Sequence, residues 1–267
     1  MTSLVSAIAS NFQDAPTIEN KFNLKKNKLL TAFVITMIND HASTVASRRC
    51  IQSIKQTNSQ IDCFILNATT PSDLKEHLDT VGFSLNEWTY PKSPAETSIN
   101  IKTGLKLTGY KATDYTKVVS CLVSHARAWY KAIELNQPIM VLEHDCIFTK
   151  QFKWLDVDNN FTGGILGLND PRGATRKSQL YHEKVVSQKS SPVAEVPWID
   201  SKDIPQGLAG NSAYIIKPSA AKHLIEKIKH IGLWPNDALM CKQLFPWLQQ
   251  AYPYYTTVQG IKSSTTL

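Results

Sequence analysis

Apolar runs of strand length alternate with segments of helical periodicity along the first third of this chain. Residues 29–38 form a continuous run rich in β-branched side chains, and residues 61–66 form a second such run. Both runs are typical of buried strands. The segments that follow them, over residues 43–56 and 74–78, begin after capping residues and are predicted to be helices. Because strands that alternate with helices assemble into parallel sheets covered by helices, the sequence predicts an α/β fold with a mostly parallel central sheet.

The apolar run over residues 139–148 stops on two acids and then resumes. In open α/β sheets, ligands bind beyond the carboxyl ends of the strands, where Glu143 and Asp145 are expected to lie. On an extended backbone their side chains point to one side, and His144 points to the other. Paired carboxylates suit Mg²⁺ or Mn²⁺, which leave further positions to water and substrate phosphates. The pattern favours an enzyme that handles a diphosphate, with two acids in a solvated turn as the alternative.

Similar patterns place elements along the rest of the chain. Helices are expected over residues 116–135, 218–231 and 236–244, and strands over residues 163–168 and 211–216. This gives one domain over residues 29–267 after a polar, basic leader over residues 1–28. Two segments interrupt the rhythm. One is a loop-rich insertion over residues 84–114. The other is a long loop over residues 169–206.

Composition narrows the class of protein. With 42% apolar and 19% charged residues, the chain resembles ordinary globular proteins, which argues against disorder or a fibre. It lacks the pattern of a secretory signal and any apolar stretch of membrane-spanning length, which predicts a soluble, cytoplasmic protein. A location peripheral to a membrane, or in an infected host cell if the source is viral, stays open. The five cysteines include no Cys-x-x-Cys pair, which argues against a disulfide framework or a zinc site.

The formal net charge of +7 is unevenly spread. Residues 21–28 contain four lysines and no acid, and residues 171–190 contain five basic residues against Glu183 alone. Such patches raise the local concentration of anions, whether sugar nucleotides, nucleic acid or anionic lipid. A solvated basic face is the alternative for each patch.

Several short segments carry a family resemblance. They are CLVSH at residues 121–125, the acid-bearing strand, GNSAYII at residues 210–216, and PND at residues 235–237. In this order and spacing they resemble glycosyltransferase family 25, which holds lipooligosaccharide sugar transferases and collagen galactosyltransferases. The first strand and the later Arg48-Arg49 pair are also similar to the family pattern. The likeness covers roughly residues 30–265, with one departure: His144 stands where the family usually has an aspartate.

The resemblance implies a single GT-A domain, a Rossmann-like α/β fold in which Mn²⁺ or Mg²⁺ is held against a nucleotide diphosphate. The cation stabilises negative charge on the departing diphosphate. Asp145 is the expected direct metal ligand, and Glu143 is expected to reach the metal through water or to hold the donor ribose. By its match to a late acid of the family, Asp237 is the expected general base, kept ionised by a helix dipole. A plain N-terminal cap is the alternative for Asp237.

Donor-binding roles follow from the same resemblance. Arg48 and Arg49 are expected to contact the donor diphosphate, because guanidinium groups suit phosphate oxygens. Lys262 and Ser263 belong to a tail that is expected to close over the nucleotide. The alternatives are solvated helix charges for the arginines and a frayed chain end for the tail.

The same resemblance suggests residues that contact the acceptor or support the site. The long loop over residues 169–206 is also expected on the acceptor side. Gly210 and Asn211 are expected beside the acceptor, since glycine permits close backbone approach, with a simple strand-entry turn as the alternative. For His144 a nitrogen ligand, an acceptor contact and a tolerated substitution all stay open. Ser124 and His125 are expected to support the site without taking part in catalysis.

Three functions follow from these features. The first is a metal-dependent, inverting transferase that moves a hexose or pentose from a nucleoside diphosphate, UDP-sugars being favoured, to a lipooligosaccharide-type glycan. The second is a phage-type transferase that glycosylates hydroxymethylated bases in DNA, for which the basic patches provide the contact. The third is a binding module for sugar nucleotides or nucleic acid that has lost turnover.

Overall fold

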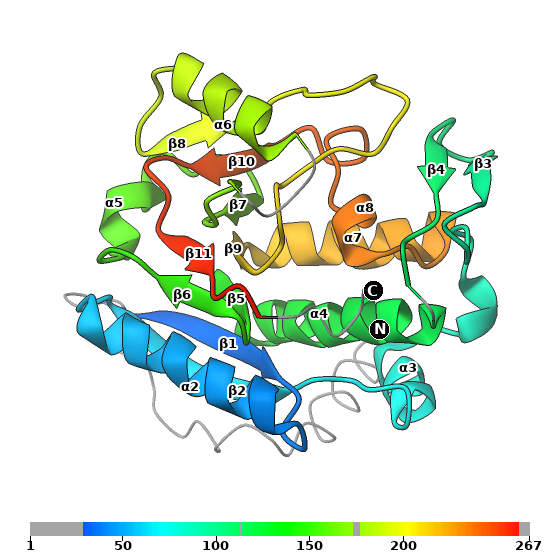
Figure 1. Ribbon diagram of the computed structural model, residues 1–267, viewed down its shortest axis with the longest axis horizontal. Coiled ribbons are helices and arrows are strands. Elements are labelled where there is room, and N and C mark those ends of the chain that lie inside the picture. The colour runs from blue at the N-terminus through cyan, green and yellow to red at the C-terminus, as the bar shows by residue number, and fades with distance from the viewer. Residues whose placement is uncertain (1–28, 113, 173–176, 262–267) are drawn as a thin grey trace.

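Seven strands form the central sheet, in the order β2-β1-β5-β9-β7-β10-β8 (Figure 1). The computed structural model describes residues 29–112, 114–172 and 177–261. The strands of the sheet are β1 (Leu30–Thr36), β2 (Ile61–Asn67), β5 (Ile139–Glu143), β7 (Ile165–Gly167), β8 (Val193–Glu195), β9 (Ala213–Ile216) and β10 (Leu248–Ala251). Within this sheet, β9 and β8 run against the other strands. The predicted α/β class with a mostly parallel sheet is therefore confirmed.

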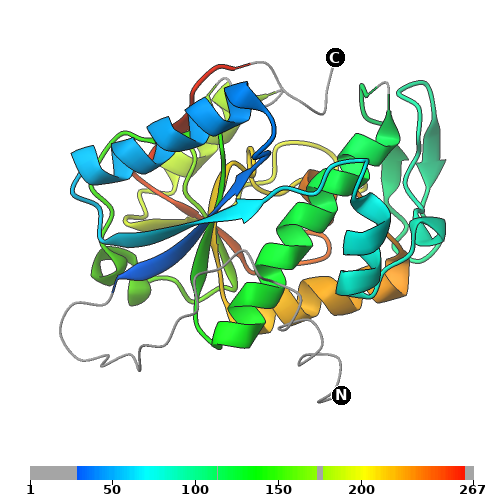
Figure 2. The ribbon, with the colours of Figure 1, turned by 90° about the horizontal axis from the view of Figure 1, so that it is seen from below.

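Alternate side chains of the strands supply two separate hydrophobic cores. Phe33 and Ile35 pack into the core that also contains side chains of α3 (Leu74–Val81), α4 (Tyr115–Leu135) and α7 (Pro218–Ile231). Ala32 and Val34 pack into the core formed with α2 (His41–Gln56) and α5 (Trp154–Asp158). Figure 2 shows α2 on one side of the sheet and α4 with α7 on the other. The first strand is apolar at nearly every position because both of its faces are covered.

Helix α4 is the longest element and leads directly into β5. The Asp114 side chain caps it by accepting a hydrogen bond from the Thr116 backbone N–H at 2.9 Å. The helix ends at Asn136, which adopts the left-handed conformation with φ of 46°. The helices predicted over residues 116–135 and 218–231 are confirmed as α4 and α7, the latter with proline at its first position.

The acid-bearing run does not continue as one strand. β5 ends at Glu143, His144 and Asp145 form a turn, and a separate strand β6 (Cys146–Phe148) pairs with β11 (Thr256–Val258) in a second, small sheet. Residue Gln259 fixes this turn: its backbone N–H donates to the Asp145 carbonyl at 2.8 Å, and its side-chain amide donates to the carbonyls of His144 and Cys146. The alternation argument for the two acids was wrong, because the backbone between them turns.

The two segments expected to be loops contain regular structure. Residues 84–114 include the 3₁₀ helix η1 (Leu85–Glu87) and a hairpin of β3 (Thr97–Ile99) and β4 (Lys106–Thr108). Residues 169–206 include α6 (Ser178–Ser187) and β8, which corrects the prediction of an irregular loop. Helix α6 buries only Tyr181 and Val185, so its sequence shows little helical periodicity. The helix expected over residues 236–244 is shorter, α8 (Asn236–Leu239).

Candidate active site

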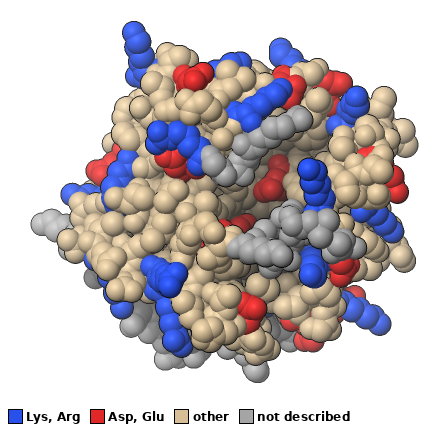
Figure 3. All heavy atoms as spheres, in the orientation of Figure 1, with Lys and Arg blue, Asp and Glu red and all other residues tan. Residues whose placement is uncertain are grey.

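Acidic side chains lie at the bottom of a hollow in one face of the molecule (Figure 3). Glu143 and Asp145 come from the end of β5 and the turn after it, and Asp237 comes from α8. Burial, followed by repulsion from the Glu143 charge, raises the pKa of both Asp145 and Asp237, so Glu143 lies close enough to each carboxyl group to act on it electrostatically. The structure thus brings together the acids that the sequence placed 92 residues apart, from Asp145 to Asp237.

The two acids of the turn have opposite pKa shifts. Burial disfavours the charged form of Glu143, but the hydrogen bond and charge of His125, together with the charge of His144, outweigh this effect and lower the Glu143 pKa. Burial and the neighbouring Glu143 charge raise the pKa of Asp145 to about 7. One carboxylate is thus held ionised by the protein, and the other lacks a positive partner among the described residues.

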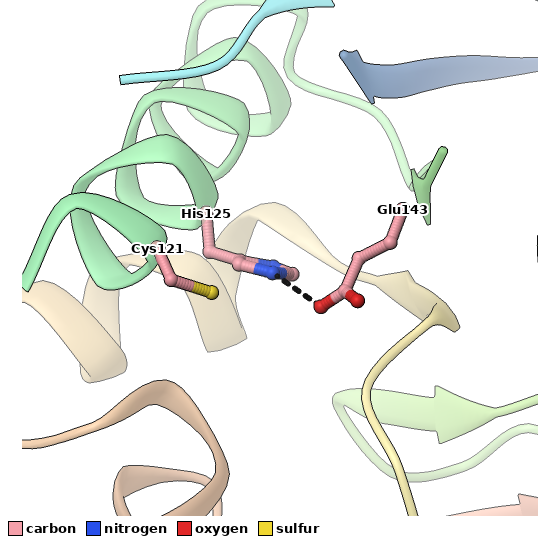
Figure 4. Close-up of side chains that lie close together, drawn as sticks. All are labelled: Cys121, His125 and Glu143. Atoms are coloured by element: carbon pink, nitrogen blue, oxygen red, sulfur yellow. Dashed lines mark hydrogen bonds and ion pairs between the residues drawn. The ribbon is translucent and has the colours of Figure 1, made fainter. Parts of the chain in front are cut away.

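A chain of hydrogen bonds that ends at His125 orients the Glu143 carboxylate. The Trp129 indole N–H donates to the Tyr214 hydroxyl at 2.8 Å, the hydroxyl lies 2.8 Å from Nδ1 of His125, and Nε2 of His125 lies 3.2 Å from Oε1 of Glu143. In the neutral imidazole, Nε2 carries the proton for Glu143, so Nδ1 accepts from Tyr214. Figure 4 shows His125 and Glu143 pointing toward one another, with Cys121 beside them. His125 is completely buried, so the predicted supporting role has a physical basis.

Tyr214 and Trp129 are site residues that sequence reasoning missed. Both are fully buried, and their polar atoms meet through one contact between residues 85 positions apart. A signal was present, since Tyr214 lies within the 210–216 segment that carries the family resemblance. Its hydroxyl supports the site, whereas the apolar residues around it form the strand.

Replacing Tyr214 by phenylalanine is expected to lower the unfolding free energy by about 1–3 kcal/mol, because two buried donor or acceptor atoms lose their partner. It is also expected to weaken Mn²⁺ binding by about tenfold or more through a misoriented His125. Chemical denaturation and metal titration measure the two effects. The matched control is Tyr181→Phe, which loses a buried hydroxyl bonded to Gln250 at 3.2 Å. If both variants bind Mn²⁺ equally well, Tyr214 has only a structural role.

A residue of the 84–114 insertion contacts the Asp237 carboxyl. The Tyr110 hydroxyl donates to its Oδ2 at 3.4 Å. The Asp237 side chain is exposed to solvent, yet protein atoms packed around the carboxyl group still exclude part of the water. This burial, with the Glu143 charge, raises the Asp237 pKa to about 6. Helix α8 has a single turn and so contributes little dipole, and burial therefore dominates the shift of the Asp237 pKa.

Ser124 ties α4 to the loop after β2. Its hydroxyl accepts a hydrogen bond from the Thr69 backbone N–H at 2.8 Å and donates to the Ser120 carbonyl at 2.8 Å. Both interactions are internal to the fold, and the side chain is 2% exposed. Ser124 therefore positions the helix that carries His125.

The structure also describes the predicted residues Arg48, Arg49 and His144. Arg48 and Arg49 are exposed on α2, and neither forms an ion pair with the three acids. His144 is partly buried, and burial lowers its pKa. Lys262 and Ser263 lie outside the described residues.

The cationic segment over residues 171–190 is partly neutralised by acids outside that range. Arg172 forms an ion pair with Asp170 at 2.7 Å, and Lys177 forms one with Asp200 at 2.6 Å. The sequence count missed these partners because Asp170 and Asp200 lie just before and well after the segment. The other patch, at residues 21–28, lies outside the described residues.

A divalent cation fits the acid turn. The Oδ1 atom of Asp145 is buried and has no hydrogen-bond partner among the described residues, which is costly for a carboxylate oxygen. Glu143 supplies a second oxygen donor whose negative charge is fixed by His125. Hard cations such as Mn²⁺ and Mg²⁺ prefer carboxylate oxygens.

Within the described ranges, no helix is both long enough and apolar enough to cross a membrane.

Comparisons with known proteins give one family match. The sequence model described as glycosyltransferase family 25 (LPS biosynthesis protein) matches residues 31–240. No curated protein matches the chain. Among solved structures, the chain is similar to the apo form of mouse xyloside xylosyltransferase 1, with 9% sequence identity and a TM-score of 0.37. That similarity covers 82% of this chain and 80% of the mouse chain. The family match includes Glu143, Asp145 and Asp237.

Proposed function

Since the chain belongs to glycosyltransferase family 25, it is a sugar transferase, and we propose that it moves a hexose or pentose from a UDP-sugar to a glycan hydroxyl with inversion. The observation that carries this proposal is that Glu143 acts electrostatically on both Asp145 and Asp237, which places the three acids in one neighbourhood. The description of the family as LPS biosynthesis proteins supports a lipooligosaccharide-type acceptor. The ion pairs of Arg172 and Lys177 give no support to DNA as the acceptor.

In this proposal Asp145 and Glu143 hold Mn²⁺ or Mg²⁺. When bound, the cation acts as a Lewis acid toward the diphosphate leaving group. His125 keeps the Glu143 carboxylate oriented and ionised through the hydrogen bond at 3.2 Å. Asp237 accepts the proton of the attacking hydroxyl, and its pKa of about 6 leaves it mostly ionised at neutral pH.

Two buried amides flank the acids and are proposed to bind sugar hydroxyls. Asn211 and Asn236 are each 4% exposed, and their side-chain nitrogen and oxygen atoms lack hydrogen-bond partners among the described residues. Asn211 precedes Ser212, whose carbonyl accepts from the Glu143 backbone N–H at 2.8 Å, and Asn236 precedes Asp237. Unpaired buried amides are costly in a folded protein, and a bound sugar supplies both donors and acceptors. This retains the predicted acceptor-side role of Asn211. Gly210 before it has φ of 87°, which glycine adopts without strain.

Two further proposed roles rest on the sequence pattern. Arg48 and Arg49, with Lys262 and Ser263, are proposed to contact the donor phosphates. His144, in the acid turn, is proposed to contact the acceptor.

The test is a panel of nucleotide sugars with Mn²⁺, scored for release of UDP or GDP. Each donor is incubated with lipooligosaccharide, a peptide, hydroxymethylated DNA or no acceptor. The expected result is UDP release that depends on the metal and is stimulated by lipooligosaccharide. Stimulation by hydroxymethylated DNA alone, with loss of activity in added salt, would replace the glycan acceptor with DNA.

Mn²⁺ is expected to stabilise the protein more at pH 8 than at pH 5, because protons compete with the cation for Asp145. Burial and Glu143 raise the Asp145 pKa from 3.8 to about 7. A raised carboxyl pKa favours the folded state at low pH, and this stabilisation is lost as the pH rises toward 7. Bound Mn²⁺ removes the repulsion between the two carboxylates that remains above pH 7.

The measurement is the unfolding temperature with and without Mn²⁺ at the two pH values. The exposed strand residue Asp62 provides the control variant Asp62→Asn, which should keep the difference between pH 5 and pH 8. Equal stabilisation at both pH values would argue against Asp145 as a metal ligand.

A further inference from the structure

Cys121, His125 and Glu143 present three different ligand atoms to one point. Cys121 and His125 are four residues apart on α4, so both side chains lie on the same face of the helix, and Glu143 approaches from the end of β5. The thiol sulfur, an imidazole nitrogen and a carboxylate oxygen all lie within 4.8 Å of one another. Figure 4 shows the three side chains converging.

We propose that Cys121, His125 and Glu143 form a second metal site, selective for Zn²⁺, whose occupation inhibits the enzyme. Zn²⁺ accepts sulfur, nitrogen and oxygen ligands in tetrahedral geometry, whereas Mg²⁺ and Mn²⁺ prefer oxygen. Ligand atoms around a tetrahedral Zn²⁺ lie about 3.5 Å apart, given bond lengths of roughly 2.0–2.3 Å. The His125–Glu143 pair, at 3.2 Å, is already close to this separation. The sequence prediction against a zinc site rested on the missing Cys-x-x-Cys pair and did not consider Cys121 with His125, four residues apart on a helix.

The groups behind His125 suit metal ligation. With Zn²⁺ on Nε2, the imidazole proton lies on Nδ1 and donates to the Tyr214 hydroxyl, which lies 2.8 Å away and also accepts from Trp129. Such a second hydrogen bond fixes the ring orientation of metal-binding histidines. The thiol proton is released to solvent when Cys121 binds as thiolate, so one proton leaves for each ion bound.

Inhibition follows because the two sites share Glu143. A carboxylate that binds Zn²⁺ beside Cys121 is withdrawn from the oxygen site that it forms with Asp145. Zn²⁺ and Mn²⁺ should therefore compete. The inhibition rests on the proposed function, but binding of the ion does not, because it uses only the ligand atoms.

Cobalt provides a direct test of binding. Metal-free protein is titrated with Co²⁺, whose bond to a thiolate gives a charge-transfer absorption in the near ultraviolet, and Zn²⁺ is then added to displace it. Wild-type protein and the control Cys63→Ser should show the band, whereas Cys121→Ser should lack it. Cys63 is a free, partly buried cysteine on β2. Absence of the band in folded wild-type protein, or an equal band in Cys121→Ser, overturns the proposal.

Transferase assays test the inhibition. Zn²⁺ should inhibit the Mn²⁺-dependent reaction of the wild type, and Cys121→Ser should need about tenfold more Zn²⁺ or higher for the same inhibition. Its turnover without Zn²⁺ should be unchanged, because the oxygen site does not use the thiol. Equal Zn²⁺ sensitivity of the two proteins contradicts the inhibitory role. A cobalt band in a protein without turnover would leave the metal site standing and remove the proposed function.

Discussion

Asp145→Asn is expected to lower kcat by about 1,000-fold or more at a Mn²⁺ concentration that saturates the wild type. The amide has the shape of the carboxylate but no charge, so it cannot replace an anionic metal ligand. The buried Oδ1 atom of Asp145, which has no hydrogen-bond partner among the described residues, then loses the proposed cation. Steady-state rates of UDP release and a Mn²⁺ titration measure the effect.

The stability of the same variant separates a metal ligand from a structural residue. Without metal at pH 8, Asp145→Asn should unfold at the same temperature as the wild type or higher, because repulsion by Glu143 is removed. The control Asp62→Asn should change neither rate nor metal affinity. A clear loss of stability together with normal Mn²⁺ binding would assign Asp145 to the fold.

Asp237→Asn is expected to lower kcat by about 100-fold or more while leaving the affinities for UDP and Mn²⁺ near wild-type values. The carboxylate that accepts the hydroxyl proton is lost, whereas the acid turn is untouched. In the wild type, activity should fall as the pH drops through about 6, where Asp237 becomes protonated. A cation bound nearby favours the charged form of Asp237 and so shifts this fall in activity to lower pH. The Asp237→Asn variant should not show the fall.

The control for this variant is Asp79→Asn. It removes the same single negative charge, but at an exposed position on α3 instead of at the proposed site. Wild-type rates in Asp237→Asn would dismiss it as the base. Weakened Mn²⁺ binding with an unchanged pH profile would instead make Asp237 a ligand of the metal.

The elements with strong periodicity could be predicted from the sequence. The buried run of β1 and the apolar face of α4 were recognised because each residue contributes to one local pattern. Helix α5 and strand β10 were missed because they are five and four residues long. Segments of that length contain too few positions for a period to be visible.

The acids of the proposed site could be singled out from the sequence, but the groups that surround them could not. Glu143 and Asp145 were identified from chain position alone, but the turn between them depends on Gln259, more than 110 residues later. The bond between Tyr214 and His125 joins residues 89 positions apart, and no local pattern reports it. The raised pKa of Asp237 could not be predicted, because burial depends on the tertiary structure around the residue.

The hydrogen bonds from Gln259 to the acid turn have a consequence for the synthesis of this polypeptide chain. Its side chain donates to the carbonyls of Ala46, His144 and Cys146, so α2, the acid turn and β6 meet at one amide. Until this glutamine has left the ribosome, the nascent chain can form much of its sheet. The turn after β5 still lacks the hydrogen bonds from Gln259. Competence to consume an activated sugar therefore arises only after Gln259 has been synthesised and has reached the turn.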